Sequence, residues 1–377
     1  MTISRVAVIY DDRDRPETTG GYCRRALEAL VEVVHFRPDQ LGRIPRRGFD
    51  LYLGVDDGLD YRLDDGLRPL AWWAIDTHLD FARCLSRARS ADLVFAAQRN
   101  GAERLRAEGV ETAEWLPLAC DPEIHRKFAV EKSRDVTFIG NVFPGPRSEL
   151  LSALGRRFPD TLIGRAYFEE MARAYSASRV VFNRSLGDDV NMRVFEALAC
   201  GSLLATNDLE GNGQATLFRD GIHLATYGGE EELIDKVAYY LAHEAAREKV
   251  AAAGRALAFA KHTYRLRMEL VLGRAEELAS SARVGPARWP VEPAGPAADA
   301  DPAVAEGVQG PGPAGGYYEF ARPELMALIP ASAVRILDVG CGAGRLGEAL
   351  KARQAAEVVG IELSAEAAAR RGRGSTG

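Results

Sequence analysis

The sequence predicts an α/β protein in which two successive units each form a parallel sheet covered by helices. Short apolar runs alternate with helical patterns over 1–120, and the alternation restarts after Asp121-Pro122 and the charged stretch 131–134. A segment rich in Pro, Gly and Ala then precedes a third, shorter unit. Strands that alternate with helices form parallel sheets with covered faces. We therefore predict a first unit at 1–120, a second at 121–281, a flexible linker at 282–316 and a partial third unit at 317–377.

Size and composition exclude several classes of protein. The chain has 377 residues, 47% of them hydrophobic and 27% charged, and its net charge of -6 gives no reason to expect a nucleic-acid partner. No apolar run approaches the roughly 18 residues that a membrane span needs, and the N-terminus lacks a secretory pattern. The five cysteines are scattered, with no C-x-x-C pair. This argues against a structural metal site and for a reducing compartment, so we expect a cytoplasmic protein.

The first unit opens with an apolar run, 5–11, that ends in acid and predicts a buried strand. Gly20 and Gly21 then precede a predicted helix at 22–31. Such a glycine pair allows close backbone approach to a phosphate or sugar, and a plain turn is the alternative. The remaining strands are predicted at 31–36, 49–55, 70–76, 93–97 and 114–118, with helices that include 81–89 and 101–108.

The second unit repeats the alternation and ends in a long helical stretch. Strands are predicted at 135–140, 161–164, 180–183, 202–206 and 223–227, and helices at 146–158 and 167–178. Residues 230–280 are almost wholly helical, with Gly254 the expected break between segments. Both units are therefore Rossmann-like, and we expect them to form two lobes that face one another across a cleft.

The stretch 188–208 holds the strongest candidate for a ligand site. Val194 and Leu198 recur at helical spacing, and Gly201 ends the helix. Arg193 and Glu196 lie three positions apart near the start of this helix, so they share one face. Ligands of parallel sheets bind outside the carboxyl ends of the strands, which is where this helix begins. The alternative is a surface ion pair on an ordinary helix.

Four motifs of the second unit occur in a fixed order: F-I-G-N-V-F-P-G-P-R (138–147), V-V-F-N-R-S (180–185), V-N-M-R-V-F-E-A-L-A-C-G (190–201) and L-F-R-D-G-I-H-L-A-T-Y (217–227). They resemble the donor lobe of GT-B-type nucleotide-sugar glycosyltransferases, most closely the spore-maturation-type family of bacteria. W-W-A-I-D-T-H (72–78) in the first unit is similar to the same family. The resemblance implies a GT-B fold and transfer of a sugar from a nucleotide-sugar donor to an acceptor hydroxyl, with retention of configuration.

The resemblance also implies roles for individual residues. Many retaining members carry two acids eight positions apart, and the matching positions here are Asp188 and Glu196, where Asp188 departs from the usual glutamate. Glu196 would bind the ribose hydroxyls, because a carboxylate accepts two hydrogen bonds. The loop 140–147 matches the loop that faces the donor diphosphate. The donor-binding residues implied are Gly20, Gly21, Gly140, Asn141, Arg147, Asn183, Asp188, Asn191, Arg193 and Glu196.

The chemistry of sugar transfer agrees with these positions. Cleavage of a sugar–phosphate bond leaves negative charge on the diphosphate, which arginines and helix N-termini can stabilise. Arg147 and Arg193 are the candidates for this catalytic role. The pairs Asp11-Asp12 and Asp56-Asp57 do not form a D-x-D metal motif, and we interpret them as solvated turns. We therefore expect no metal and no cofactor in the transfer.

Asp76 and His78 are the candidates for activating the acceptor hydroxyl or orienting the transferring sugar. They follow the apolar run L-A-W-W-A-I-D, and functional side chains often lie at such strand ends. The alternative is that Asp76 caps the following helix. Asn183 and Asn191 could equally be turn residues. His125, His223, His243 and His262 receive no role.

The third unit contains D-V-G-C-G-A-G between a strand at 336–339 and a helix that ends near Arg353, followed by a strand that ends in Glu362. Together with Y-Y-E-F-A-R-P-E-L (317–325), it resembles the first motifs of class I S-adenosylmethionine-dependent methyltransferases. Asp338, Gly340, Gly342, Gly344 and Glu362 would bind S-adenosylmethionine. Because one β-α-β unit cannot bury its apolar face alone, we expect methyl transfer only from a longer parent protein.

Two other functions stay open from the sequence. Methyl transfer could be the main activity, with residues 1–280 as a binding module. Alternatively, the two lobes could bind a nucleotide sugar or a glycan without turnover. The sequence does not identify the nucleotide base, the sugar or the acceptor, which could be a glycan, a protein or a lipid carrier.

Overall fold

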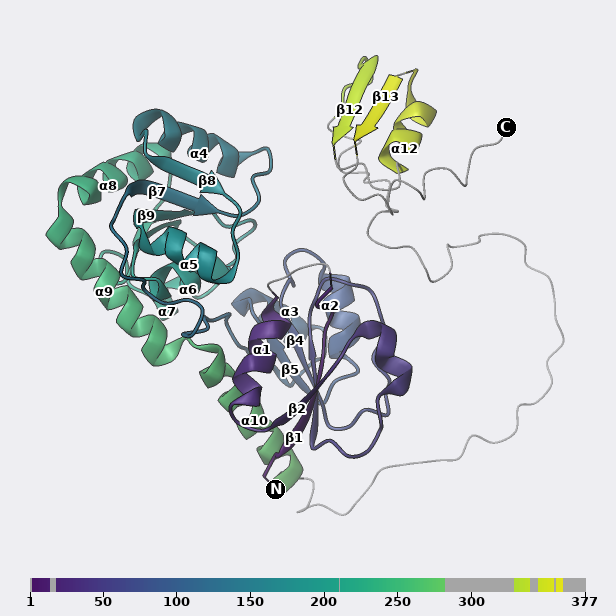
Figure 1. The fold of residues 1–377 in the computed structure, drawn as a ribbon. Coiled ribbons are helices and arrows are strands. Elements are labelled where there is room, and N and C mark those ends of the chain that lie inside the picture. The colour runs from purple at the N-terminus through teal and green to yellow at the C-terminus, as the bar shows by residue number, and fades with distance from the viewer. Residues whose placement is uncertain are drawn as a thin grey trace. The chain divides into compact units, whose positions relative to one another are not determined.

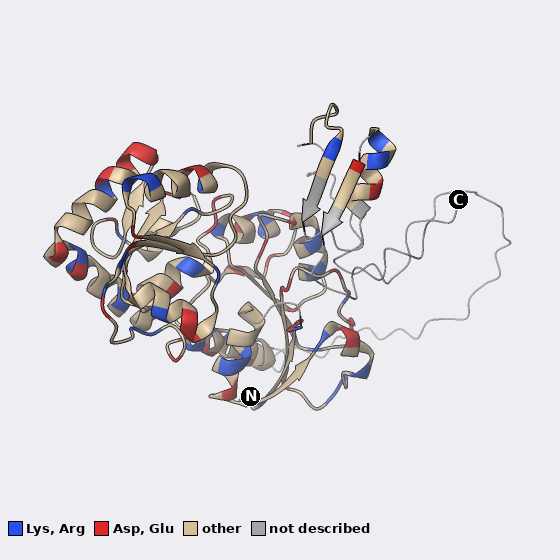
Figure 2. Ribbon diagram, turned by 45° about the horizontal axis from the view of Figure 1, so that its top comes forward, with Lys and Arg blue, Asp and Glu red and all other residues tan. Residues whose placement is uncertain are grey.

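The computed structural model describes residues 2–13, 18–209, 211–281, 329–339, 345–355 and 357–361. The chain divides into two compact units, Met1–Pro290 and Val291–Gly377. The first unit contains two parallel sheets with helices packed on them, and the second contains one small parallel sheet (Figure 1). In Figure 2 the charged residues lie mostly on helices and loops, while the strands are largely uncharged, as buried parallel strands should be.

The first sheet has six parallel strands in the order β2-β1-β3-β4-β5-β6. Its strands are β1 (Arg5–Ile9), β2 (Glu32–Phe36), β3 (Leu51–Val55), β4 (Leu70–Ala74), β5 (Leu93–Ala96) and β6 (Ala113–Trp115). The connections hold the helices α1 (Thr19–Glu28), α2 (Phe81–Ala88) and α3 (Arg99–Ala107) and a short 3-10 helix, Pro38–Arg43. The predicted strands are confirmed, although β6 ends at Trp115. Helix α1 begins at Thr19, so Gly20 and Gly21 lie inside its first turn rather than before it.

The second sheet has five parallel strands in the order β11-β10-β9-β7-β8. Its strands are β7 (Arg134–Ile139), β8 (Thr161–Gly164), β9 (Ser178–Asn183), β10 (Leu203–Asn207) and β11 (Ala225–Tyr227). The helices between them are α4 (Pro146–Arg157), α5 (Phe168–Ser176), α6 (Met192–Ala199) and α7 (Gln214–Leu217). Each predicted strand and helix of this lobe is confirmed. Since all strands run in one direction, the carboxyl ends of β7, β9 and β10 meet at one edge.

Three helices follow the second sheet: α8 (Glu230–Ala242), α9 (Glu244–Lys261) and α10 (Tyr264–Ser281). The prediction of a break at Gly254 is wrong, because the breaks fall at His243 and at His262–Thr263. Gly254 lies inside α9, where a Cβ would overlap the carbonyl oxygen of His223 and the side chain of Leu198. This glycine therefore permits close packing of the helix and does not interrupt it.

Helix α10 returns to the first sheet and ties the two lobes together (Figure 1). The ring of Tyr264 stacks on Tyr22 of α1 at 5.0 Å and meets the edge of Trp73 of β4 at 6.3 Å. Arg267 donates hydrogen bonds to the carbonyl oxygens of Pro117 and Leu118 at 2.7 and 3.1 Å. One hydrophobic cluster consequently runs from β1 and α1 through α10 to α6.

The second compact unit contains β12 (Arg335–Val339), α12 (Arg345–Arg353) and β13 (Glu357–Ile361). The two strands pair in parallel, with Arg335 opposite Glu357, and Leu346, Leu350 and Val358 form a small core. The strand–helix–strand order agrees with the prediction. Gly340, Gly342, Gly344, Glu362 and the predicted linker 282–316 lie outside the described residues, as does the side chain of Asp338.

Two further properties bear on the expectations about compartment. The described cysteines, Cys23, Cys84, Cys120 and Cys200, are buried and form no disulfide bond. Within the described ranges, no helix is both long and apolar enough to span a membrane.

The stability of this fold should fall in mild acid through His262, which lies between α9 and α10. Burial and the adjacent Arg267 lower the pKa of His262 from 6.5 to about 4. Between pH 4 and pH 6.5, His262 therefore binds a proton in the unfolded chain and stays neutral in the folded chain. The contribution of neutral His262 to the free energy of unfolding is fully present above pH 6.5. It is lost as the pH falls toward 4, and the loss reaches about 3 kcal/mol.

Replacing His262 by Phe should flatten this pH dependence, because the aromatic contacts with Phe195 and Phe218 can persist without a titrating group. Urea unfolding between pH 4.5 and 7.5 measures the slope of the unfolding free energy. The same change at the exposed His243 serves as the matched control. A slope in H262F equal to that of the wild type would show that another group is responsible.

Candidate active site

The candidate site lies at the carboxyl ends of β7 and β9, where the arginine of α6 joins the two strands. Arg193 donates from Nε to the carbonyl oxygen of Ile139 at 3.0 Å and from Nη1 to Oδ1 of Asn183 at 2.7 Å. A Cβ on Gly140 would overlap its Nη2 atom, and the φ of Gly140 is 149°. Gly140 therefore leaves room for a guanidinium at the strand end. The resemblance implied that Gly140 binds the donor, and the structure places the guanidinium of Arg193 against it.

Arg147 lies beside Arg193, but its side chain points at the backbone. Its Nε and Nη2 donate to the carbonyl oxygen of Arg184 at 2.9 and 2.7 Å, and Nη1 donates to that of Asn141 at 3.1 Å. Only 8% of Arg147 is exposed. Arg147 thus fastens the loop 140–147 to the end of β9. Asn141 contributes a backbone oxygen to this arrangement.

Arg147 and Arg193 both pack against the ring of Phe138, at 5.5 and 4.5 Å from its centroid. Burial and the charge of Arg193 lower the pKa of Arg147 to about 10, and Arg184 adds to the effect. Among the described residues, no carboxylate lies within 4.0 Å of Arg147, Arg184 or Arg193. Buried charges are normally paired, so this cluster of three guanidiniums is suited to an anion from outside the chain.

Asn183 is the centre of a buried hydrogen-bond network at the end of β9. Its Nδ2 donates to Oγ1 of Thr206 at 3.0 Å, and Nδ2 of Asn191 donates to its Oδ1 at 3.2 Å. Its carbonyl oxygen accepts from the hydroxyl of Tyr227 at 2.7 Å. Asn183 is fully buried, so it is neither an ordinary turn residue nor open to a ligand. It holds Arg193 and the start of α6 in place.

The loop before α6 places two neighbouring acids in opposite environments. Asp188 is exposed and has a φ of 30°, and its carbonyl oxygen accepts from Nδ2 of Asn212. Asp189 is buried and accepts from Nε2 of Gln98 in the first sheet's lobe at 2.9 Å. Burial raises the pKa of Asp189 well above the usual range. The sequence pointed to Asp188 as a donor-binding residue but not to Asp189 or Gln98. The second acid of D-D-V-N was the signal that could have indicated Asp189.

Asp76 and His78 belong to the first lobe and lie near the loop that precedes α6. The charges of both act on Asp189, where His78 lowers its pKa and Asp76 raises it. The ring of His78 lies 3.8 Å from the place that a Cβ on Gly187 would take. Its buried Nδ1 has no hydrogen-bond partner among the described residues. The structure therefore brings together the acceptor-side candidates and the loop that begins α6.

The alternative role of Asp76 as a helix cap is wrong. Asp80 caps α2, because its side chain accepts from the backbone N–H of Arg83 at 3.0 Å. The backbone of Asp76 instead forms a turn, with its carbonyl oxygen accepting from the N–H groups of Leu79 and Asp80.

Glu196 is buried at the junction of the lobes, so the alternative of a surface ion pair is also wrong. Its Oε1 lies 3.9 Å from Nε2 of His125, which in turn lies 3.1 Å from the hydroxyl of Tyr22. The N–H of Asp121 donates to Nδ1 of His125 at 2.9 Å, so the proton of the neutral ring is on Nε2. His125, which the sequence analysis left without a role, is therefore a partner of Glu196.

Gly20 and Gly21 lie in the first turn of α1 beside a pocket of about 470 Å³. Oγ1 of Thr18 accepts from the N–H of Gly21 at 3.1 Å and caps the helix. A Cβ on Gly20 would overlap the ring of Tyr10, so this glycine serves packing. Gly21 lines the pocket, together with Tyr22 of α1 and Phe168 at the start of α5. The pocket thus has walls from both lobes.

The interpretation of the aspartate pairs as solvated turns is wrong. Asp56 is buried and forms an ion pair of 2.5 Å with Arg83, and Asp11 is buried and paired with Arg13. Asp57 accepts from the N–H of Asp11 and from the hydroxyl of Tyr61. These carboxylates fix the strand ends of the first sheet. No cluster of three or more metal-ligating side chains occurs in the part of the chain that is described.

Comparisons with known proteins agree with this arrangement. Residues 126–273 match a family model described as "Glycosyl transferase-like". HepE from Anabaena, solved in complex with UDP and glucose, is 14% identical with a TM-score of 0.54, over 73% of this chain and 99% of that chain. Sucrose-phosphate synthase from Thermosynechococcus elongatus is 12% identical with a TM-score of 0.53, over 74% and 100% of the two chains. A search of curated proteins gave no match.

A third solved structure, AviGT4, is a glycosyltransferase involved in avilamycin A biosynthesis. It is 15% identical with a TM-score of 0.53, over 74% of this chain and 99% of that chain. At these identities the likeness establishes the fold, and the predicted GT-B architecture is confirmed. The fold is therefore that of GT-B glycosyltransferases, and residues 126–273 are similar to a glycosyl transferase-like family.

Replacing Gly140 by Ala should displace Arg193 and destabilise the protein, because the new Cβ would overlap Nη2 and the φ of 149° disfavours a side chain. We expect a loss of about 1–3 kcal/mol in the free energy of unfolding. Gly155→Ala in α4 is the matched control, since nothing lies within 4 Å of the added Cβ. That helical change should stabilise by about 0.5–1 kcal/mol. Equal unfolding free energies in G140A and wild type would contradict the packing described for Arg193.

Proposed function

We propose that the chain transfers a sugar from a nucleoside diphosphate sugar to an acceptor hydroxyl, with the donor bound at the carboxyl edge of the second sheet. The observation that carries the proposal is the cluster of Arg147, Arg184 and Arg193 without a nearby carboxylate. A departing diphosphate develops negative charge at this step, and fixed positive groups stabilise it. The GT-B fold supports the same location, because ligands of parallel sheets bind at the carboxyl ends.

The arginines differ in what they can contribute. Arg184 is half-buried and Arg193 is partly exposed, so both can reach a diphosphate directly. Arg147 is held by carbonyl oxygens and would act through its charge and by shaping the loop 140–147. The N-terminus of α6 adds a positive dipole end beside them. We infer that Arg193 and Arg184 bind the diphosphate, while Arg147 supports the site through its charge and by shaping the loop 140–147.

We further propose that Glu196 binds the ribose and that Asp76 and His78 face the transferring sugar and the acceptor. Nε2 of His125 lies 3.9 Å from Oε1 of Glu196 and orients this carboxylate at the junction of the lobes. The charges of Asp76 and His78 act on the buried Asp189 in the loop before α6, and burial raises the pKa of that carboxyl. Groups with a shifted pKa are common at functional sites. Asp188 and the pair Gly20 and Gly21 remain candidates for further donor contacts.

Retention of configuration and membership of the spore-maturation-type family remain proposals from the motifs. An inverted anomeric configuration in the product, measured by proton NMR, would contradict retention. HepE was solved with UDP-glucose, so we propose uridine as the first base to test. The glycines of the methyltransferase motif lie outside the described residues, and methyl transfer stays a prediction from the sequence.

A panel of UDP, GDP, dTDP and ADP sugars, scored by thermal shift, tests the donor proposal. A ligand that prefers the folded state raises the melting temperature. We expect a response to one nucleotide class and about 10- to 100-fold weaker binding in Arg184→Gln, since a charge-assisted hydrogen bond contributes roughly 1.5–3 kcal/mol. Arg173→Gln on α5 is the matched control, because Arg173 is exposed and paired with Glu169.

Two outcomes of the panel would count against the proposal. If R184Q and R173Q bind the nucleotide equally well, the arginine cluster is not the diphosphate site. If a nucleotide sugar binds but is never cleaved under any condition, the chain is a binding module rather than an enzyme. A response to S-adenosylmethionine alone would favour the methyltransferase hypothesis.

Sugar transfer should not depend on a divalent cation, because the guanidinium cluster already supplies positive charge for the leaving group. We expect donor cleavage to persist, within about twofold, after treatment with EDTA and removal of the chelated metal. Release of the nucleoside diphosphate measures the rate. Activity that EDTA abolishes and manganese restores would refute this part of the proposal.

A further inference from the structure

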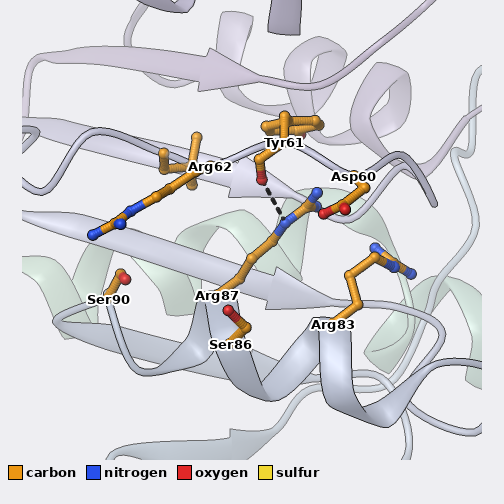
Figure 3. A pocket seen from close by; sticks show the side chains of 8 residues that line it. Asp60, Tyr61, Arg62, Arg83, Ser86, Arg87 and Ser90 are labelled. Carbon is orange, nitrogen blue, oxygen red and sulfur yellow. Dashed lines mark hydrogen bonds between the residues drawn. The ribbon is translucent and has the colours of Figure 1, made fainter. Parts of the chain in front are cut away.

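A second pocket, of about 540 Å³, lies in the first lobe between α2 and the loop that follows β3 (Figure 3). One face of α2 and the turn after it carry Arg83, Ser86, Arg87 and Ser90, which are spaced by three or four positions and so lie on one side of the helix. The loop contributes Asp60 and Arg62 from the opposite side, and Arg62 also pairs with Asp65 at 2.7 Å. Three arginines and two serine hydroxyls therefore line the pocket together with one acid.

Arg87 is the unusual member of this group, because it is a buried cation that forms no ion pair with the residues that the structure describes. Only 6% of it is exposed, and no carboxylate of the described residues lies within 4.0 Å of it. Its Nε and Nη2 donate to the carbonyl oxygens of Tyr61 and Leu59, while its Nη1 is buried and has no hydrogen-bond partner. In Figure 3 the side chain of Arg87 extends from α2 toward the loop, and the side chains of Arg62 and Arg83 lie on either side of it.

Neither neighbouring aspartate lies within ion-pair distance of Arg87, although the charge of Arg87 acts on the carboxylates of both Asp56 and Asp57. Asp56 is engaged by Arg83 at 2.5 Å, and Asp57 accepts from the hydroxyl of Tyr61 and from backbone N–H groups. The guanidinium of Arg87 lies over the rings of Tyr61 and Trp72, at 4.1 and 5.0 Å. Aromatic faces stabilise a cation only modestly. Buried polar groups are normally hydrogen-bonded, so the unpartnered Nη1 of Arg87 is a donor that an anion in the pocket can use.

The pocket is also connected to the acceptor-side candidates. Asp56, which binds Arg83 through Oδ1, accepts through Oδ2 from the N–H groups of Ile75 and Asp76 at 3.3 and 3.4 Å. One carboxylate thus separates the pocket from Asp76.

We propose that this pocket binds an oxyanion group, phosphate or carboxylate, on the acceptor of sugar transfer. The assignment to the acceptor rests on the proposed function, whereas the binding of an oxyanion by Arg62, Arg87, Ser86 and Ser90 does not. Hydroxyls and guanidiniums both donate to an oxyanion, and arginine matches its geometry with two parallel hydrogen bonds. The acceptor is therefore an acidic molecule, such as a phosphorylated or carboxylated glycan or lipid, and not a neutral sugar.

Inorganic phosphate is the probe for the pocket, with saturating UDP present to occupy the donor site. Phosphate should broaden its own phosphorus NMR line and raise the melting temperature of the wild-type protein at constant ionic strength. Ser86→Glu places a negative charge on the exposed wall and should weaken phosphate binding at least tenfold. Ser152→Glu, an equally exposed change on α4, is the matched control and should bind phosphate normally.

A second variant, Arg62→Gln, removes an exposed cation without touching the hydrogen bonds of Arg87, and should weaken phosphate binding several-fold. Its melting temperature without ligand, like that of S86E, shows whether the variant is folded. Acetate replaces phosphate in a parallel titration and distinguishes a carboxylate site from a phosphate site. Equal phosphate binding in wild type, S86E and R62Q would overturn the proposal.

Cleavage of the donor in water separates this proposal from the proposed function. If the donor is cleaved and an anionic acceptor such as glycerol 3-phosphate or glucuronate is preferred over glycerol or glucose, the acceptor assignment stands. If the donor is cleaved but S86E leaves the preference for acidic acceptors unchanged, the pocket is not the acceptor subsite. If phosphate binds the pocket but no donor is bound or cleaved, the proposed function fails and the oxyanion site remains.

Discussion

The site depends on one constraint: strands that all run in one direction bring their carboxyl ends, and the side chains that follow them, to a single edge. In the second sheet this edge gathers Gly140, Asn183 and the start of α6. Arg193 joins these ends by hydrogen bonds to Ile139 and Asn183 and occupies the space that Gly140 leaves open. The result is a cluster of guanidiniums whose positive charges are fixed by backbone carbonyl oxygens rather than neutralised by acids.

The lobes are joined by a hinge and by α10, and this connection explains why acceptor-side and donor-side residues can meet. The backbone of Cys120 exchanges hydrogen bonds with His262 and Tyr264 where the chain passes between the lobes. Tyr264 then packs on Tyr22 and Trp73, so the first lobe is held by an aromatic cluster. On the opposite side of the junction, Gln98 donates to Asp189. These contacts place Asp76 and His78 beside the loop before α6.

The two lobes differ in how the charged side chains at their strand ends are paired. In the first lobe, Asp11 and Asp56 are buried and neutralised by Arg13 and Arg83, which stabilises the sheet edge. In the second lobe, Arg147, Arg184 and Arg193 have no carboxylate within 4.0 Å among the described residues, and we propose that a ligand supplies the anion. In the first lobe, Arg87 likewise forms no ion pair with a described residue. We propose the pocket beside α2 as a second place where this protein receives an anion.

The amino-acid sequence alone was enough to predict the α/β class, the positions of nearly all strands and helices, and the arginine and acid that open α6. These features are local: an apolar run of five residues or a helical repeat is written in consecutive residues. It also predicted that Arg147 and Asn183 would face the donor, whereas the structure turns both toward the protein interior.

Which residues share an environment became visible in the folded chain. The pairing of His125 with Glu196, the contact of Gln98 with Asp189, and the continuity of α9 through Gly254 each depend on residues that are distant in sequence or on a close approach of two backbones. The burial that raises the pKa of Asp189 and encloses Arg87 arises when the chain is packed. No local pattern carries that information, because burial is a property of the neighbours that folding brings together.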